Sequence, residues 1–234
     1  MNIAAVSFRV AIATAALAAA SAAHADLTIP FGFTNSNSVQ TFTDDNLAAY
    51  DLVNLTVTAA GSTTAVGPVV VGESNGTKNS KAFSLPITKI VIGAKLNIAS
   101  GSAVGSALKF NRLDLDTGEA LGFTLANFTI DYNKKLVLAD VTPNGGTVAL
   151  QQPIYLFNVA TPLGLKYKFP LTVTGHEVLD RLLLSPGAKT LFINTLKLPE
   201  FAIPALDLEF GNLTQDISTN LRKTAVSGKP YVAK

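Results

Sequence analysis

Histidine is scarce in this sequence, and its scarcity limits the acid–base chemistry open to the chain. Of the two histidines, His24 falls in an N-terminal leader described below, so His176 is the base that any serine-histidine-aspartate triad would need. The G-x-S-x-G turn that positions a nucleophilic serine is missing, because Ser102 in the stretch GSAVG stands at the wrong offset. The chain has no cysteine, which excludes thiolate chemistry. We therefore predict no catalytic residues, and we expect a protein that is not an enzyme.

His176 and Glu177 begin a stretch that matches part of a zinc-binding motif. The motif H-E-x-x-H has a second histidine four residues after the first, whereas Asp180 stands at that position here. The apolar residues of 175–184 have helical spacing, and Ser185-Pro186-Gly187 is typical of a helix end. We therefore interpret residues 175–184 as a short helix with acids in its first turn, where the helix dipole favours them, and not as a metal site.

Asp114, Asp116 and Glu119 form the densest acidic cluster of the sequence. Calcium binds carboxylates at alternate positions of a loop, so these three residues are the candidates for a metal site. Gly118, however, arrives one position earlier than the glycine of the twelve-residue calcium loop. A hairpin turn closed by this glycine explains the same residues and is the simpler interpretation.

Tyrosines are the remaining side chains that could ligate a cofactor. Tyr50 and Tyr167, together with His176, are candidates for binding a haem-like group, since haem iron accepts both tyrosine and histidine ligands. Both tyrosines fall in phase with apolar neighbours, so packing in the core with the hydroxyl toward water is the simpler expectation. Nothing in the spacing selects a ligand set, and we predict no cofactor.

The first twenty-five residues have the layout of a secretory signal peptide. Arg9 precedes a run of apolar and small residues over 10–20, and Ala23-His24-Ala25 fits a small-x-small cleavage site. The apolar run is about half as long as the roughly 20 residues that a membrane-spanning helix needs. We therefore interpret residues 1–25 as a cleaved leader. The mature chain is then expected in the periplasm, outside the cell or at its surface, without a transmembrane segment.

The mature chain is predicted to form one domain over residues 26–221, followed by a polar tail at 222–234. Its clearest element is the stretch 165–174, where apolar and polar residues alternate as they do in a half-buried strand. Similar strands joined by short turns fill residues 120–174. The alternation slips near Ala126-Asn127, and a slip of one residue predicts a β-bulge.

Only two short helices are predicted beside these strands, at residues 44–53 and 175–184. The first begins after Thr43, whose hydroxyl can cap a helix that has acids in its first turn. Three further strands are predicted near the C-terminus, at residues 190–198, 205–210 and 213–218. Many short strands with frequent turns indicate a mainly β fold. We expect an antiparallel β-sandwich, with a barrel-like form as the alternative.

Charge is sparse, which bears on the partners of the protein. Charged residues make up 15% of the sequence and the formal net charge is +2, without a basic stripe, so a nucleic acid partner is not expected. A thinly charged surface also does little to keep copies apart. Residues 69–71 and 90–92 are uncharged β-branched runs that would pair with a second copy if either lay at a sheet edge. The sequence is therefore compatible with a homo-oligomer or a surface assembly formed by copies of the chain.

The sequence supports three functional hypotheses. The first is an exported, non-enzymatic β-domain that serves as a structural or adhesive protein at the cell surface, with self-association through strand edges. The second is a secreted or periplasmic module that binds an apolar or haem-like ligand. A hydrolase built on two carboxylates remains a third hypothesis, because its partners can be distant in sequence.

Overall fold

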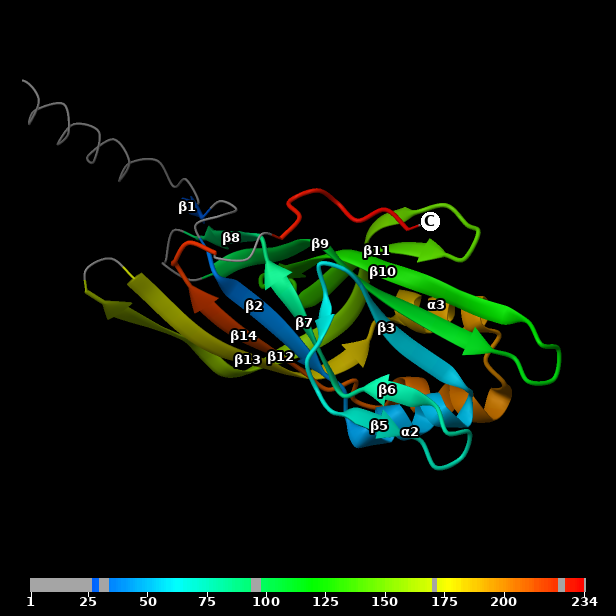
Figure 1. Ribbon diagram of the computed structural model, residues 1–234. Coiled ribbons are helices and arrows are strands. Elements are labelled where there is room, and N and C mark those ends of the chain that lie inside the picture. Colours follow the sequence, from blue (N-terminus) through cyan, green and yellow to red (C-terminus); the bar gives the residue numbers. More distant parts are fainter. Residues whose placement is uncertain (1–26, 30–33, 94–97, 170–171, 223–225, 234) are drawn as a thin grey trace, which may run out of the picture.

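The computed structural model describes residues 27–29, 34–93, 98–169, 172–222 and 226–233 (Figure 1). The predicted leader, residues 1–25, lies outside the described residues. Within the described part of the chain, no helix is both long and apolar enough to cross a membrane.

Antiparallel strands make up most of the fold. In chain order they are β1 (Leu27–Ile29), β2 (Ser36–Thr41), β3 (Leu55–Gly61), β4 (Thr64–Ala65), β5 (Val69–Val71), β6 (Lys78–Ser80), β7 (Ala82–Ile87), β8 (Lys89–Ile92), β9 (Ile98–Leu113), β10 (Ala120–Asp131), β11 (Leu136–Pro143), β12 (Ala149–Lys168), β13 (Thr172–Leu184) and β14 (Asn212–Ser218). Among the described residues, three short helices accompany them: α2 (Asp44–Leu52), α3 (Pro186–Leu196) and the 3-10 helix η1 (Glu200–Asp207).

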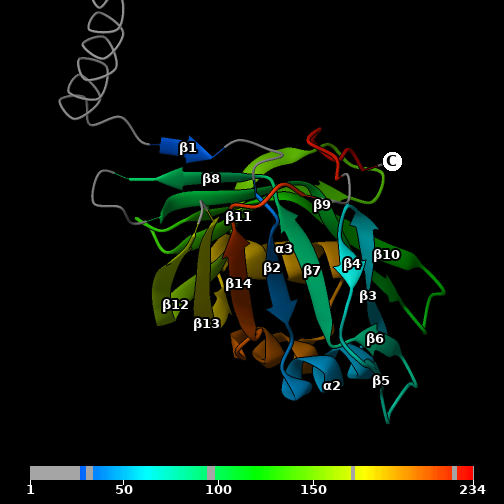
Figure 2. The same ribbon diagram turned by 60° about the vertical axis from the view of Figure 1, so that its left-hand side comes forward.

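One curled antiparallel sheet contains twelve of the strands. Its order is β1-β8-β9-β10-β11-β12-β13-β14-β2-β7-β4, with β3 also paired to β9, while β5 and β6 form a separate pair. The sheet curls because residues 82–92 join its two sides: β7 pairs with β2, and β8, which begins after Thr88, pairs with β9. The result is a half-barrel (Figure 2). The expected mainly β, antiparallel fold is thus confirmed, in its barrel-like form.

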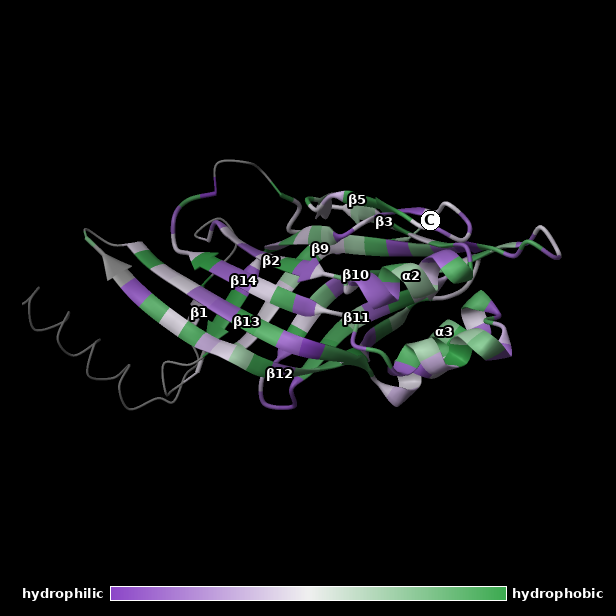
Figure 3. Ribbon diagram, turned by 90° about the horizontal axis from the view of Figure 1, so that it is seen from below, coloured by the Kyte–Doolittle hydropathy of each residue, from purple (hydrophilic) through white to green (hydrophobic). Residues whose placement is uncertain are grey.

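Strand β14 shows how a strand presents one side to the interior of the half-barrel. On β14, Leu213, Gln215 and Ile217 are buried, while Thr214 is half-buried and Asp216 is exposed. Figure 3 shows hydrophobic and hydrophilic bands along β13 and β14. Side chains of an extended chain change face at every residue, so this alternation fixes which residues can reach an interior site.

Helix α3 packs on the concave side of the sheet (Figure 2). The rings of Phe110 and Phe123 are stacked with their centroids 5.0 Å apart, and Phe192 of α3 meets them edge-on at 5.4 and 4.9 Å. All three side chains are almost completely buried. Aromatic burial of this extent is a major contribution to core stability. These three rings fill the part of the half-barrel between α2 and the middle of the sheet.

The helix predicted at residues 175–184 is wrong, because these residues belong to strand β13. Arg181 has a φ of 50° and lies in a β-bulge, where β13 has one more residue than the facing segment of β12. The bulge shifts the alternation by one residue, so Leu179 faces inward before it and Leu182 and Leu184 face inward after it. Because the bulge interrupts the residue-by-residue alternation of the strand, the apolar residues of 175–184 have a spacing that matches a helix.

The segment 185–187 begins a helix instead of ending one. The hydroxyl of Ser185 accepts a hydrogen bond of 3.1 Å from the N–H of Ala188, and Pro186 occupies the first turn of α3. Serine at the N-cap followed by proline is a favoured helix start. The strand predicted at 190–198 is consequently wrong, and α3 covers most of it.

The single strand predicted at 165–174 is wrong, because β12 ends at Lys168, β13 begins at Thr172, and the two strands pair with each other across this range. The strand predicted at 205–210 is wrong, since η1 occupies the first half of that range. The strand at 213–218 is confirmed as β14, and the helix at 44–53 is confirmed as α2. Thr43 caps α2 as expected, its hydroxyl accepting a hydrogen bond from the N–H of Asn46 at 3.2 Å.

The bulge predicted near Ala126-Asn127 is confirmed, and it anchors the C-terminal segment. Asn127 has a φ of 53°, and its amide accepts a hydrogen bond from the N–H of Tyr231 at 2.8 Å and donates to the carbonyl of Tyr231 at 3.0 Å. The same amide donates to Asp140 at 2.8 Å. The segment 226–233 therefore lies against the sheet, fixed by one buried asparagine.

Candidate ligand-binding site

His176 lies on the outer side of the half-barrel. It alternates with Glu177, which faces inward, and its Nδ1 lies 2.8 Å from Oδ1 of Asp216 on β14. The side chains of His176 and Asp216 are 56% and 66% exposed, so this pair is in contact with solvent. No third group of the described chain makes a hydrogen bond with this imidazole.

Tyr50 lies in the core at the opposite end of the fold, on α2. Its ring meets those of Phe42, Phe110 and Phe210 edge-on, and burial raises the pKa of its hydroxyl well above the usual value. The structure therefore does not bring Tyr50 and the exposed His176 into one site. Tyr167 is paired through its backbone with Val173, and its side chain lies outside the described part of the chain.

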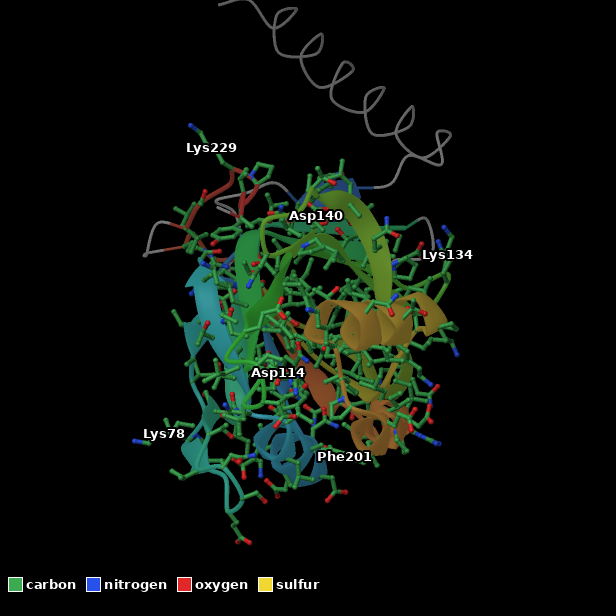
Figure 4. All side chains as sticks on the ribbon, turned by 90° about the vertical axis from the view of Figure 1, so that its right-hand side faces the viewer. Lys78, Asp114, Lys134, Asp140, Phe201 and Lys229 are labelled. Atoms are coloured by element: carbon green, nitrogen blue, oxygen red, sulfur yellow. The ribbon has the colours of Figure 1, made fainter. Side chains whose placement is uncertain are left out.

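The acidic cluster around Gly118 forms the turn between β9 and β10, as Figure 4 shows for Asp114. The N–H groups of Asp116 and Thr117 donate to Oδ1 of Asp114 at 3.0 and 3.3 Å, and these bonds lower the pKa of Asp114. Glu119 is paired instead with Lys197, at 2.6 Å. In the described residues, no three acidic, histidine or cysteine side chains are grouped as a metal site.

A cavity of about 330 Å³ opens where the β12–β13 hairpin projects from the half-barrel, and we call it the mouth cavity. Its lining comes from β9, β12, β13 and the residue that follows β10, and it consists of Ile98, Tyr132, Val159, Pro162, Leu163, Leu165 and Glu177. The lining is apolar apart from one phenol and one carboxyl group. Such a composition is usual for pockets that bind small apolar molecules.

Tyr132 and Glu177 form the polar part of the mouth cavity. Tyr132 directly follows β10, its ring meets Phe157 edge-on at 5.9 Å, and its hydroxyl donates a hydrogen bond to Oε2 of Glu177. Glu177 is only 4% exposed, and burial raises its pKa although the bond from Tyr132 lowers it in part. Burial, the charge of Glu177 and the same hydrogen bond all raise the pKa of Tyr132. The pair is thus a neutral phenol bound to a carboxyl group in an apolar setting.

A row of buried polar residues continues from Glu177 into the interior. In the register of the sheet, Glu177 lies opposite Gln215 on β14, and Gln215 lies opposite Ser38 on β2. Gln215 and Ser38 line a second, narrow space of about 30 Å³, and Nε2 of Gln215 has no hydrogen-bond partner among the described residues. Hydrogen-bonding groups therefore extend from the mouth cavity toward the middle of the half-barrel.

Sequence reasoning missed Tyr132 and Glu177 as site residues. Glu177 was assigned to a helix, where it would have been one of several acids in a first turn. The signal that could have revealed it is the alternation of Gly175, Glu177 and Leu179, which places a glutamate on the buried face of a strand. A glutamate at such a position is rare unless it is paired.

A larger cavity of about 450 Å³ lies between α3 and strands β11 and β12. Among its lining residues are Leu136, Ile154, Leu156 and Leu191, and none of the described residues that line it is ionisable. Gln152 and Ser185 are the polar side chains of its described lining, and the other lining side chains are apolar.

Neither a scan against protein-family models nor a comparison with curated protein sequences gave a match. Among solved structures, the C-terminal domain of HtaA from Corynebacterium glutamicum is similar to this chain, with a TM-score of 0.44 and 16% sequence identity. The similarity covers 78% of this chain and 96% of that domain. A similarity at this level carries no inference about ligand or activity.

Proposed function

We propose that this chain is a non-enzymatic binding module that takes a small, mainly apolar molecule in the mouth cavity. The observation that carries the proposal is the 330 Å³ cavity with an apolar lining and a single buried phenol–carboxyl pair. Ligand pockets commonly have a volume of roughly 300–1,000 Å³ and a few placed polar groups. The imidazole that any general-base mechanism would favour lies on the outer side of β13, which supports binding over catalysis.

A dye-binding measurement tests this proposal. The neutral dye N-phenyl-1-naphthylamine should bind the chain saturably, and Val159→Trp, which fills the mouth cavity, should weaken binding by about tenfold or more. Leu156→Trp is the matched control, because Leu156 is a similarly exposed residue of β12 that lines the cavity beside α3 instead. Absence of saturable binding, or loss in the control alone, would contradict the proposal.

A separate titration tests whether the ligand is a haem-like group. Hemin added to the purified chain should give a shifted Soret band only if a side chain ligates its iron. Tyr132→Phe and His176→Ala then distinguish the mouth cavity from the outer face of β13. An unshifted spectrum would restrict the proposal to apolar ligands without a metal.

Self-association is a second candidate function, and the observation that favours it is strand β5. Val69 and Val71 are 63% and 57% exposed, β5 pairs with β6 on one side, and no other described strand pairs with it. Exposed β-branched edges can pair with another chain. Light scattering after size exclusion should show an oligomer that Val69→Lys/Val71→Lys dissolves and Leu115→Lys, at another exposed position, does not. A monomer at all concentrations would reject this candidate.

Export is also proposed, on the layout of residues 1–25. Mass spectrometry of the protein recovered from its own cells should find a mature chain that begins at Asp26. A chain that retains Met1 would contradict cleavage.

A further inference from the structure

The carboxyl group of Glu177 has fewer partners than the other buried carboxylates of the described chain. Asp51 accepts four hydrogen bonds, from the N–H groups of Ser74, Asn75 and Thr77 and from the Thr77 hydroxyl. Asp140 is bound by Asn127 and by two groups of Gln151. These two carboxylates are therefore satisfied within the protein.

Glu177 accepts one hydrogen bond, from Tyr132 to Oε2. No described donor binds its Oε1, and no lysine, arginine or histidine of the described chain lies within 4.0 Å of the carboxyl group as an ion pair. A buried carboxylate is costly unless it is paired or hydrogen-bonded. Glu177 lines the mouth cavity, so a partner for Oε1 can come from a ligand there.

We propose that the ligand of the mouth cavity is an apolar molecule that carries an ammonium group, and that Glu177 binds this group. This inference rests on the proposed function and names the ligand class of the same site. The ammonium donates to Oε1 while Tyr132 continues to donate to Oε2. The apolar body of the ligand then lies against residues such as Val159 and Leu163.

The lining of the cavity explains why a cation is selected. Among the described residues that line it, Glu177 is the only acid and none is basic, so a ligand carboxylate would meet another carboxyl group without a compensating cation. A neutral hydroxyl could donate to Oε1, but its bond would lack the assistance of opposite charge that strengthens an ammonium–carboxylate contact. The expected order of affinity is therefore amine, alcohol, carboxylate.

Three ten-carbon probes test this order on the full mature chain at neutral pH: decylamine, decanol and decanoate, each measured by displacement of N-phenyl-1-naphthylamine. Decylamine should bind about tenfold tighter than decanol, and decanoate should bind most weakly. In Glu177→Gln, decylamine should fall to the affinity of decanol, while decanol should change little. Asp216→Asn, an exposed carboxylate on the outer face of the sheet, is the control and should leave all three affinities unchanged.

The outcomes separate the inference from the function it rests on. Equal affinities for the three probes, or an amine preference that survives Glu177→Gln, would overturn the ammonium assignment and leave an apolar binding module. Absence of displacement by any probe would overturn both. The comparison within the wild-type chain decides the order even if a variant fails to fold, and circular dichroism reports folding of each variant.

Discussion

At the scale of single residues, the buried carboxylates Asp51 and Glu177 have opposite environments. Burial alone would raise the pKa of Asp51, but hydrogen bonds from Asn75, Thr77 and Ser74 together lower it to about 2. Glu177 has one such bond, and burial leaves its pKa raised. The number of donors around each carboxyl group decides the direction of the shift. Asp51 therefore stabilises the fold, whereas the carboxyl group of Glu177 is the one proposed to bind a ligand.

Asp51→Asn should destabilise the protein, because the loop between β5 and β6 is folded around this carboxylate. A pKa lowered from 3.8 to about 2 corresponds to about 2 kcal/mol of stability. Since the folded pKa lies below the unfolded one, this stability is present above about pH 4 and is lost as the pH falls toward 2. Urea unfolding between pH 2 and 7 measures it.

The variant's free energy of unfolding should depend less on pH across that window. Asp44→Asn is the control, because the Asp44 side chain is 79% exposed in its pair with Lys81, and exposed pairs contribute little. Equal losses in the two variants would contradict the role of Asp51.

Glu177→Gln should raise the thermal unfolding midpoint at pH 7 or leave it unchanged. The folded pKa of Glu177 is raised, so ionisation costs wild-type stability as the pH rises above the unfolded value of roughly 4.3. A neutral amide of the same shape avoids this cost. The difference between variant and wild type should vanish at acidic pH, and scanning calorimetry across pH tests this. A variant less stable than wild type at pH 7 would show that the ionised carboxyl group is structural.

At the scale of elements, β-bulges determined which strands could be recognised from the sequence. The slip near Asn127 interrupts a long, regular alternation, so it was recognisable as a bulge. The bulge at Arg181 lies between Leu179 and Leu182, and there the interrupted alternation coincides with helical spacing. A segment of ten residues contains too few apolar positions to separate the two patterns. The same misassignment concealed Glu177, since strand and helix place it on different faces.

Asn127 combines a strained backbone with a hydrogen-bonding side chain, and two substitutions separate these contributions. Asn127→Gly keeps the left-handed conformation and loses the bonds to Tyr231 and Asp140, each worth about 1 kcal/mol. Asn127→Ala loses the same bonds and adds about 1 kcal/mol of backbone strain. Chemical denaturation should therefore rank wild type above the glycine variant and the glycine variant above the alanine variant.

Release of the C-terminal segment is the second readout for Asn127. Limited proteolysis should cut near Lys229 faster in both variants than in wild type, because the anchor of Tyr231 is gone. Unchanged cleavage in both variants would contradict this role of Asn127.

At the scale of the whole molecule, the curled sheet depends on pairings that sequence patterns do not encode. β2 pairs with β14, some 170 residues away, and with β7, and alternation identifies a strand without identifying its partner. The mainly β class was predictable from composition and turns. The half-barrel and its mouth cavity could not be predicted, and neither could the contact between Tyr132 and Glu177. These features depend on which strands pair and in which register.

The main aromatic core and the proposed binding site occupy different ends of the fold and meet at Tyr132, whose ring packs against the core. The aromatic core with α2 and α3 fills one end of the half-barrel, and the mouth cavity lies at the other, beside the β12–β13 hairpin. A ligand can therefore be bound without opening the main core. Residues that stabilise the protein, such as Phe110, are distinct from those proposed to select the ligand.

Titration of decylamine into the isotope-labelled chain, followed by amide nuclear magnetic resonance, tests the proposed binding at the mouth cavity most directly. Saturable shifts should centre on Ile98, Tyr132, Leu163 and Glu177, and Glu177→Gln should weaken them. Shifts centred on Ile154 and Leu191 beside α3, or no saturable shift at all, would contradict a binding site at the mouth of the half-barrel.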